Sequence, residues 1–164
     1  MIACATDKGI CLLEFTDRKM LETEFKGLAK QLNAQILQGE NPHFAALRTQ
    51  LKEYFDGVRK TFSLPLHTPG TEFQNEVWQC LQSIPYGKTR SYLEQAKSIQ
   101  NPGAVRAVAN ANGMNRICIV IPCHRVIGTD GSLTGFGGGI WRKKWLLDLE
   151  RSHSDQPSVQ LTLL

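Results

Sequence analysis

The segment from Pro65 to Gly70 divides the chain into two parts with different sequence patterns. It carries two prolines and a glycine, which interrupt helices and strands and mark a loop or linker. Before it, the spacing of apolar residues indicates both strands and amphipathic helices, and after it short helical patterns follow one another closely. We therefore expect an α/β fold of the α+β type. An N-terminal α/β lobe is expected over 1–66 and a mainly helical domain over 67–164.

The first part carries the pattern of a β-hairpin followed by two helices. Asp7-Lys8-Gly9 separates two strand-like runs and is typical of a tight turn. Leu21, Phe25, Leu28 and Leu32 recur at helical spacing and predict an amphipathic helix. The expected elements are strands at 2–6, 10–16 and 35–38, and helices at about 18–32 and 43–57.

Three short helices are predicted in the second part, and capping residues mark where they begin. Thr71 precedes an amphipathic run that Pro85-Tyr86-Gly87 ends, and Ser91 opens a run with capping-box spacing. Asn101-Pro102 places an N-cap residue before a proline at the first helical position. The third helix is therefore expected over about 102–112.

This third helix, which closes at Gly113, is rich in alanine and carries a single arginine, Arg106. Two short helices followed by a third outline a helix-turn-helix, with this helix in the recognition position. A major-groove reader needs several side chains that hydrogen-bond to bases. Small residues with one arginine instead suit close approach to a minor groove. Packing of the small residues against another helix explains the pattern equally well, so the residues alone leave both interpretations open.

The last part of the chain combines a turn, a glycine-rich loop and a helix. Asp130-Gly131 lies between Val126-Ile127 and Leu133, which is a hairpin signal. Residues 135–139 contain four glycines, and such a loop lets the backbone pass close to a ligand. A final helix is expected over about 140–150. A loose polar tail is expected over 152–164.

Cys123 and His124 follow the apolar run 117–121 and are the residues most suited to chemistry. A cysteine attacks as its thiolate, and a neighbouring base or cation lowers its pKa. A buried Cys-His pair is also a common structural feature. In an extended segment the two side chains point to opposite faces, so activation of Cys123 requires a bend or a bridging water. Glu150 is the best acid to orient the imidazole. The weaker alternatives are Asp148 and Asp130.

Charge and cysteine content narrow the class of protein. The chain has a net charge of +4, with 41% apolar and 21% charged residues, which is typical of globular proteins. Between Lys88 and Arg125 lie six basic residues and one acid, which suits a polyanion or forms a solvated basic face. No membrane-spanning run or secretory signal is visible. Five irregularly spaced cysteines indicate a reducing compartment, so we expect a cytoplasmic protein.

Several motifs, in order along the chain, resemble those of the O6-alkylguanine-DNA alkyltransferases, also called methylated-DNA–protein-cysteine methyltransferases. The centre of the resemblance is Pro122-Cys123-His124-Arg125-Val126. Matching pieces cover about 70–150, and weaker ones lie in the first lobe. The main pieces are Gly70-Thr71-Glu72-Phe73-Gln74, Val77-Trp78, Ile84-Pro85-Tyr86-Gly87-Lys88-Thr89, Ser91-Tyr92, Ala104-Val105-Arg106-Ala107-Val108, Asn115, Gly135-Phe136, Leu146-Leu147, Glu150 and, in the first lobe, Glu53-Tyr54-Phe55.

The resemblance implies an RNase H-like first lobe and direct DNA repair without a cofactor. Cys123 would accept the alkyl group of O6-alkylguanine, and that of O4-methylthymine, irreversibly and once per molecule. His124 would carry the thiol proton through a water, and Glu150 would orient His124. Tyr92 would assist the guanine leaving group, and Asn115 would brace the turn that presents the cysteine.

The resemblance further implies that a monomer binds double-stranded DNA through the minor groove. Arg106 would take the place of the damaged base, which is flipped out of the stack. The other DNA contacts expected are Ala104, Ala107, Tyr92, Arg125, Thr71 and Gln74. The substrate pocket is expected to contain Val126, Phe136, Gly137, Gly138 and Met114.

Some residues depart from the family pattern. Phe136 stands where the family often has tyrosine, so a hydroxyl is missing there. Gly137 and Gly138 replace bulkier residues, which predicts a roomier pocket that tolerates larger alkyl groups. We expect no structural zinc, because Cys4 and Cys11, with the distant His43 and His67, form no convincing tetrahedral set.

Three other functions remain as alternatives. A cysteine hydrolase would need a separate His–Asn pair and an oxyanion motif. A methyltransferase with a soluble methyl donor would need a glycine-rich strand-to-helix turn, whereas the glycines at 135–139 follow a hairpin signal. A module that recognises lesions without repairing them would not need a cysteine at position 123.

Overall fold

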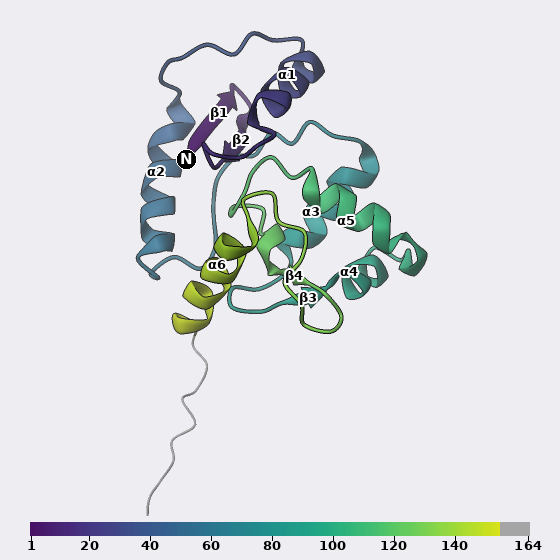
Figure 1. Cartoon of the computed structure of the whole chain (residues 1–164). Helices are drawn as coiled ribbons and strands as arrows, with labels where there is room; N and C mark the ends of the chain where they lie inside the picture. Colours follow the sequence, from purple (N-terminus) through teal and green to yellow (C-terminus); the bar gives the residue numbers. More distant parts are fainter. Residues whose placement is uncertain (155–164) are drawn as a thin grey trace, which may run out of the picture.

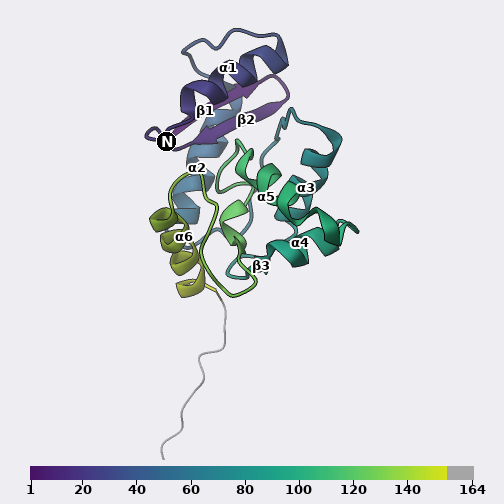
Figure 2. The ribbon, with the colours of Figure 1, turned by 45° about the vertical axis from the view of Figure 1, so that its right-hand side comes forward.

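The computed structural model describes residues 1–154, which form a small strand-and-helix lobe stacked on a helical one (Figures 1 and 2). The first lobe contains the hairpin β1 (Ile2–Thr6) and β2 (Gly9–Glu14), with α1 (Leu21–Leu32) and α2 (Pro42–Phe55). These elements confirm the predicted hairpin and both predicted helices. The tail predicted over 152–164 lies, from residue 155 onward, outside the described residues.

The strand predicted over 35–38 is wrong. Residues 34–38 form neither helix nor strand and lie exposed between α1 and α2. Leu37 is 80% exposed, so its apolar side chain has no sheet or core to pack against. A short apolar segment forms a strand only where a partner strand and a buried face exist.

Strand β2 is completely buried because later segments of the chain cover it. On one side it pairs with β1 in antiparallel register. On the other side Ile10 N donates to Pro65 O at 2.9 Å, and Cys118 N donates to Leu13 O at 2.9 Å. The segment predicted as a linker is therefore hydrogen-bonded to β2 at its start. The same strand also holds the run that leads to Cys123.

The helical lobe begins with α3 (Glu72–Gln82), β3 (Arg90–Ser91), α4 (Tyr92–Ser98), the 3-10 turn η1 (Pro102–Ala104) and α5 (Val105–Gly113). Capping boxes at Thr71 and Ser91 confirm the predicted starts of α3 and α4. Asn101 stands at the predicted N-cap position with Pro102 directly after it, but its side chain makes no capping bond and a 3-10 turn opens the third helix. Helix α5 packs on α3, where Trp78 Nε1 donates to Ala111 O at 2.8 Å.

The remaining elements are the 3-10 turn η2 (Cys123–Arg125), β4 (Val126–Ile127) and α6 (Ile140–Ser152). The turn predicted at 130–131 forms, since Gly128 N donates to Ser132 O at 2.8 Å. The predicted hairpin ladder does not form, because β4 pairs in parallel with β3.

Figures 1 and 2 show α6 beside α2, so the end of the chain returns to the first lobe. No helix within residues 1–154 is long and apolar enough to cross a bilayer.

Gly9 is required where β2 meets the segment at Pro65. Its φ is +145°, and a Cβ there would lie 2.3 Å from the Pro65 carbonyl oxygen. Gly9→Ala is expected to lower the free energy of unfolding by about 2 kcal/mol or more, because positive φ and a backbone clash add. Gly39→Ala is the matched control, since its Cβ would meet nothing within 4 Å. Urea denaturation measures both, and equal stabilities of the two variants would contradict the expectation.

Candidate functional site

Cys123 is presented by a tightly folded turn that Asn115 holds together. Asn115 Nδ2 donates to Ile121 O at 2.8 Å and to Cys123 Sγ at 3.2 Å. Its Oδ1 accepts from Ile117 N at 3.0 Å. One buried side chain therefore links the start of the turn, its end and the sulfur itself. The geometry agrees with the bracing position that the family resemblance implied for Asn115.

The expectation that Cys123 lies in an extended segment is wrong. The backbone of 117–121 folds back on itself, with Ile121 N donating to Ile117 O at 2.9 Å. Ile119 has φ +73°, a conformation that is strained for a β-branched residue. The 3-10 turn η2 follows directly, and within it His124 is buried while Cys123 is partly exposed. The bend that activation of Cys123 requires is thus part of the backbone.

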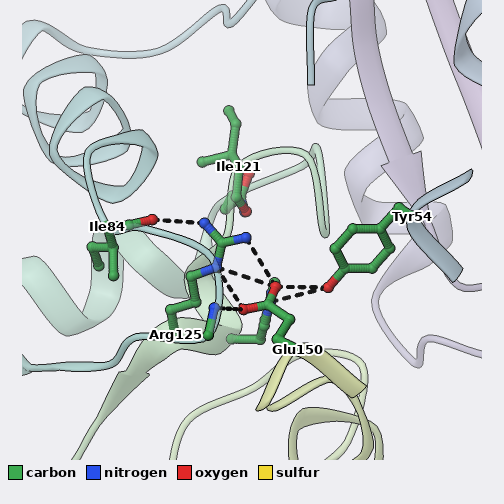
Figure 3. A network of polar contacts seen from close by, with 8 residues as sticks. Tyr54, Ile84, Ile121, Arg125 and Glu150 are labelled. Atoms are coloured by element: carbon green, nitrogen blue, oxygen red, sulfur yellow. Dashed lines mark hydrogen bonds and ion pairs between the residues drawn. The ribbon is translucent and has the colours of Figure 1, made fainter. Parts of the chain in front are cut away.

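Glu150 in α6 is the centre of a buried polar network that contains His124 (Figure 3). His124 Nε2 and the Tyr54 hydroxyl each lie 2.8 Å from Glu150 Oε1, and the hydroxyl donates its proton to that oxygen. The Gly87 amide donates to Oε2 at 3.0 Å. Glu150 is therefore the partner of His124, as predicted. The two weaker alternatives lie elsewhere: Asp148 pairs with Lys144, and Asp130 accepts from Ser132.

The network fixes the charge state of its members. Burial opposes ionisation of Glu150, but hydrogen bonds from His124 and Arg125, together with the Arg125 charge, lower its pKa. Burial lowers the pKa of His124, against the pull of Glu150, so the imidazole is neutral at physiological pH. A neutral ring that faces a carboxylate through Nε2 carries its proton there. Nδ1, which is buried and has no hydrogen-bond partner among the described residues, then keeps its lone pair for use as a base.

Arg125 does not occupy the position that we expected from a DNA contact. It is 6% exposed, and its Nε and Nη2 donate to Glu150 at 2.9 Å. Its Nη1 donates to the Ile84 carbonyl oxygen at 2.6 Å (Figure 3). All of its donor groups thus point into the protein. The DNA contact is corrected to a structural role, because a phosphate contact requires an exposed guanidinium.

Lys143 is a buried cation beside the nucleophile that the sequence analysis missed. Its side chain is completely buried, and Nζ donates to Thr134 O at 2.6 Å and lies 5.8 Å from the centre of the Tyr92 ring. Burial lowers the pKa of Lys143 to about 8. The pKa of Cys123 is itself lowered, first by a hydrogen bond from Cys118 and further by Asn115 and the Lys143 charge. Position 143 falls in an Arg-Lys-Lys run that reads as surface.

Tyr92 lies against the loop that follows Cys123. Its hydroxyl donates to Thr134 O at 3.1 Å, so this carbonyl accepts from both Tyr92 and Lys143. Gly135 has φ +61°, and a Cβ there would lie 2.8 Å from the Tyr92 hydroxyl. The glycine therefore lets the loop close over the tyrosine. Burial raises the pKa of Tyr92 and the charge of Cys123 raises it further, so the two groups interact electrostatically.

The predicted roomier pocket at Gly137 and Gly138 finds no support. A Cβ on Gly137 would lie 2.5 Å from the Arg18 guanidinium, and one on Gly138 would lie 2.7 Å from the Phe15 ring. Side chains of the first lobe already occupy the space that the missing side chains leave. Phe136 packs edge-on against Phe15 at 6.5 Å. The other expected pocket residues differ in exposure: Val126 is buried and Met114 is exposed.

Apart from Tyr92 and Arg125, the residues expected to contact DNA lie in η1 and α5 and at the start of α3. Val108 and Ala111 of α5 are buried against the lobe, whereas Arg106 and Ala107 are exposed and Ala104 is half-buried. The packing interpretation is thus confirmed for the buried face of the helix, and the minor-groove interpretation stays a prediction for the exposed face. Thr71 and Gln74 are engaged in the capping box of α3, and Gln74 Nε2 also lies 3.1 Å from Met114 Sδ.

Lys143→Met is expected to slow alkylation of Cys123 by iodoacetamide at pH 7 by roughly twofold to threefold, because a nearby cation favours the thiolate. The Lys143 charge lowers the pKa of Cys123, so its removal raises that pKa and shifts the reactivity of the thiol to higher pH. Lys143→Arg keeps the charge and should retain most of the rate. Lys144→Met is the matched control, since Lys144 is exposed and paired with Asp148. The same slow-down in both methionine variants would contradict the assignment.

Comparison with known proteins identifies two family domains in the chain. The ribonuclease-like domain of 6-O-methylguanine DNA methyltransferase matches residues 1–68. The DNA-binding domain of the same family matches residues 72–152, which include Cys123, His124 and Glu150. The α+β fold class, with a ribonuclease-like first lobe and a helical second one, is thereby confirmed.

Individual relatives agree with the family domains. The chain is 58% identical over 116 residues to a methylated-DNA–protein-cysteine methyltransferase of Mycolicibacterium paratuberculosis, covering 70% of each chain. It is 40% identical over 155 residues to the inducible enzyme of Bacillus subtilis, covering 94% of this chain and 86% of the relative. The crystal structure of Mycobacterium tuberculosis OGT in complex with DNA matches with a TM-score of 0.78 and 40% identity, over 93% of this chain and 86% of that one. The chain therefore belongs to the methylated-DNA–protein-cysteine methyltransferase family.

Proposed function

We propose that this protein repairs DNA directly, by moving the alkyl group of O6-alkylguanine to the sulfur of Cys123. The observation that carries the proposal is the arrangement around that sulfur. Asn115 donates to it, and the adjacent His124 is neutral, buried and bound to Glu150 through Nε2. A thiol beside an oriented base is the arrangement that nucleophilic catalysis requires. The family membership supplies the substrate class.

The reaction would proceed by a single displacement. The thiol proton passes to His124 Nδ1 through a water, and the imidazolium that forms is stabilised by the Glu150 carboxylate. The thiolate then attacks the alkyl carbon, and the carbon–oxygen bond breaks with its electron pair on guanine. Tyr92 provides the proton or hydrogen bond that the departing guanine needs. The products are a thioether on Cys123 and an intact guanine, and since the thioether is stable each molecule acts once.

The DNA would bind through the minor groove, with the exposed face of α5 against it. This face carries Arg106 and Ala107, and its small residues permit close approach to the duplex. Arg106 would fill the space of the flipped-out base. The relative from Mycobacterium tuberculosis was crystallised in complex with DNA, which supports DNA as the partner. Ala104, Thr71 and Gln74 would contact the strands beside it.

Both parts of the chain would contribute to DNA repair. The protein would act as a monomer in the cytoplasm. The division at 66/67 gives the second part the DNA contacts and the acceptor cysteine. The first part contributes Tyr54, whose hydroxyl donates to Glu150. All five cysteines are free, which suits a reducing compartment. O4-methylthymine would be a further substrate, since it carries the same alkyl–oxygen bond.

Mixing the protein with a duplex that contains O6-methylguanine is expected to add one methyl group per molecule, in exchange for a proton. Intact mass and peptide mapping measure the gain and locate it on Cys123. Cys123→Ser should gain nothing yet still bind the duplex, whereas Cys80→Ser, at a half-buried thiol outside the site, should be methylated normally. Tight binding of the lesion without any mass gain would instead indicate a recognition module and overturn the proposal.

Arg106→Ala is expected to slow transfer from the duplex by roughly tenfold or more, because the flipped-out state loses the side chain that replaces the base. Transfer from free O6-benzylguanine should be unchanged, since no base has to leave a stack. Lys30→Ala removes the same charge from an exposed position on α1 and serves as the control. Equal losses on the duplex and on the free base would contradict a role in base flipping.

A further inference from the structure

Arg18 is a largely buried arginine of the first lobe that the mechanism proposed above does not use. It lies between β2 and α1, and its side chain is 10% exposed. Its Nη1 forms an ion pair with Glu14, the last residue of β2, and its Nη2 lies 2.6 Å from Glu24 Oε1. The side chains of these two acids are 0% and 12% exposed. Charge-assisted bonds to two carboxylates fix the orientation of a planar guanidinium.

Strand β2 anchors Glu14 and, through it, Arg18. The strand is completely buried and is hydrogen-bonded to β1 on one side and to later segments of the chain on the other. Glu14 Oε1 also accepts from Phe15 N at 2.9 Å, which holds the carboxylate at the end of the strand. The position of the Arg18 guanidinium therefore follows from that of β2.

The guanidinium of Arg18 contacts two elements of the second lobe, one with its edge and one with its face. At the edge, Nη2 donates to the carbonyl oxygen of Gly113, the last residue of α5, at 3.1 Å. At the face, Nη1, Cζ and Nη2 would lie 2.5, 2.6 and 2.9 Å from a Cβ on Gly137, so the plane of the group lies against that glycine. Arginine can make both contacts at once because its charged group is flat and carries several donors.

The two contacts lie at the two sides of the expected substrate pocket. Met114, which directly follows Gly113, is expected on one side, and the 135–139 loop with Gly137 on the other. Arg18 therefore connects the end of α5 with this loop beside the residues that are expected to surround the alkylated base.

The next residue of the loop is attached to the first lobe as well. Gly138 O accepts from Arg142 Nη1 at 2.9 Å, and Arg142 Nη2 donates to Asp17 Oδ2 at 2.7 Å. The Asp17 side chain is 61% exposed, so water and salt weaken this second attachment. The ion pairs of Arg18 are buried and are screened much less. Arg18 is therefore the stronger of the two attachments.

We propose that Arg18 is a positioning residue for the alkylated base, which fixes the distance between the end of α5 and the 135–139 loop and thereby the width of the substrate pocket. This role rests on the proposed transfer of an alkyl group to Cys123. A pocket wall that can move orients a small methyl substrate poorly, and a misplacement of about 1 Å can slow a reaction by about 100-fold. A larger alkyl group fills the additional space and is less affected.

The test measures transfer at saturating DNA from two duplexes that differ only in the alkyl group, one with O6-methylguanine and one with O6-benzylguanine. Arg18→Lys keeps the charge that Glu14 and Glu24 require, but an ammonium group lacks the flat face and the fork that reach both walls. Methyl transfer is expected to slow by roughly tenfold and benzyl transfer by less than about threefold. Alkylation of Cys123 by iodoacetamide, which requires the thiolate and not the pocket, should stay within about twofold of the wild-type rate.

Arg116→Lys is the matched control, because Arg116 also joins the lobes but does so through Gln31 Oε1 at 2.9 Å and Pro69 O at 3.3 Å. All three of its rates should equal those of the wild type. Circular dichroism verifies that each variant is folded. If Arg18→Lys is not, Gly137→Ala repeats the test, since its Cβ would displace the guanidinium.

Three results would overturn the proposal: equal losses of methyl and benzyl transfer, a parallel loss of reactivity with iodoacetamide, or no loss at all. Absence of any transfer by the wild type would refute the repair function itself and this role with it. Failure of the positioning role alone, with transfer by the wild type intact, is therefore distinguishable from failure of the repair function.

Discussion

The buried carboxylate of Glu150 is the interaction on which the rest of the site depends. It comes from the last helix, and its partners come from α2, from the turn before β3 and from η2. A buried charge is tolerated only where hydrogen bonds and an opposite charge compensate it. Loss of one partner from such a pair typically costs about 3–5 kcal/mol. The same carboxylate that holds the imidazole in one tautomer thus also holds distant parts of the chain together.

The loop that leads to Cys123 is strained, and the surrounding structure maintains its conformation. Ile119 adopts a conformation that isoleucine avoids, and the loop it belongs to is secured by β2 on one side and by Asn115 on the other. Rigid support of this kind fixes the direction of a reactive sulfur before the substrate arrives. The polar groups around the sulfur then set its charge.

Much of the fold was predictable because local signals and tertiary structure agree. Thr71 and Ser91 mark helix starts with side-chain bonds that the sequence spacing specifies, and the hairpin turn at Gly9 is local as well. The turn at Ile119 could not be predicted, because it contradicts the residue's own preference and depends on distant partners. The roles of Arg125 and Lys143 were missed for a related reason. Both are cations, which are ordinarily exposed, and only the fold buries them.

The Tyr54–Glu150 hydrogen bond has a consequence for how this protein can be divided or recombined. By sequence the two family domains meet between residues 68 and 72, where a cut would look natural. The hydroxyl that satisfies Glu150, and the strand that supports the loop before Cys123, nevertheless belong to the first domain. A chimera that exchanged the domains would have to carry both features across the junction. Each lobe therefore depends on the other for its stability, and the two have to be transferred together.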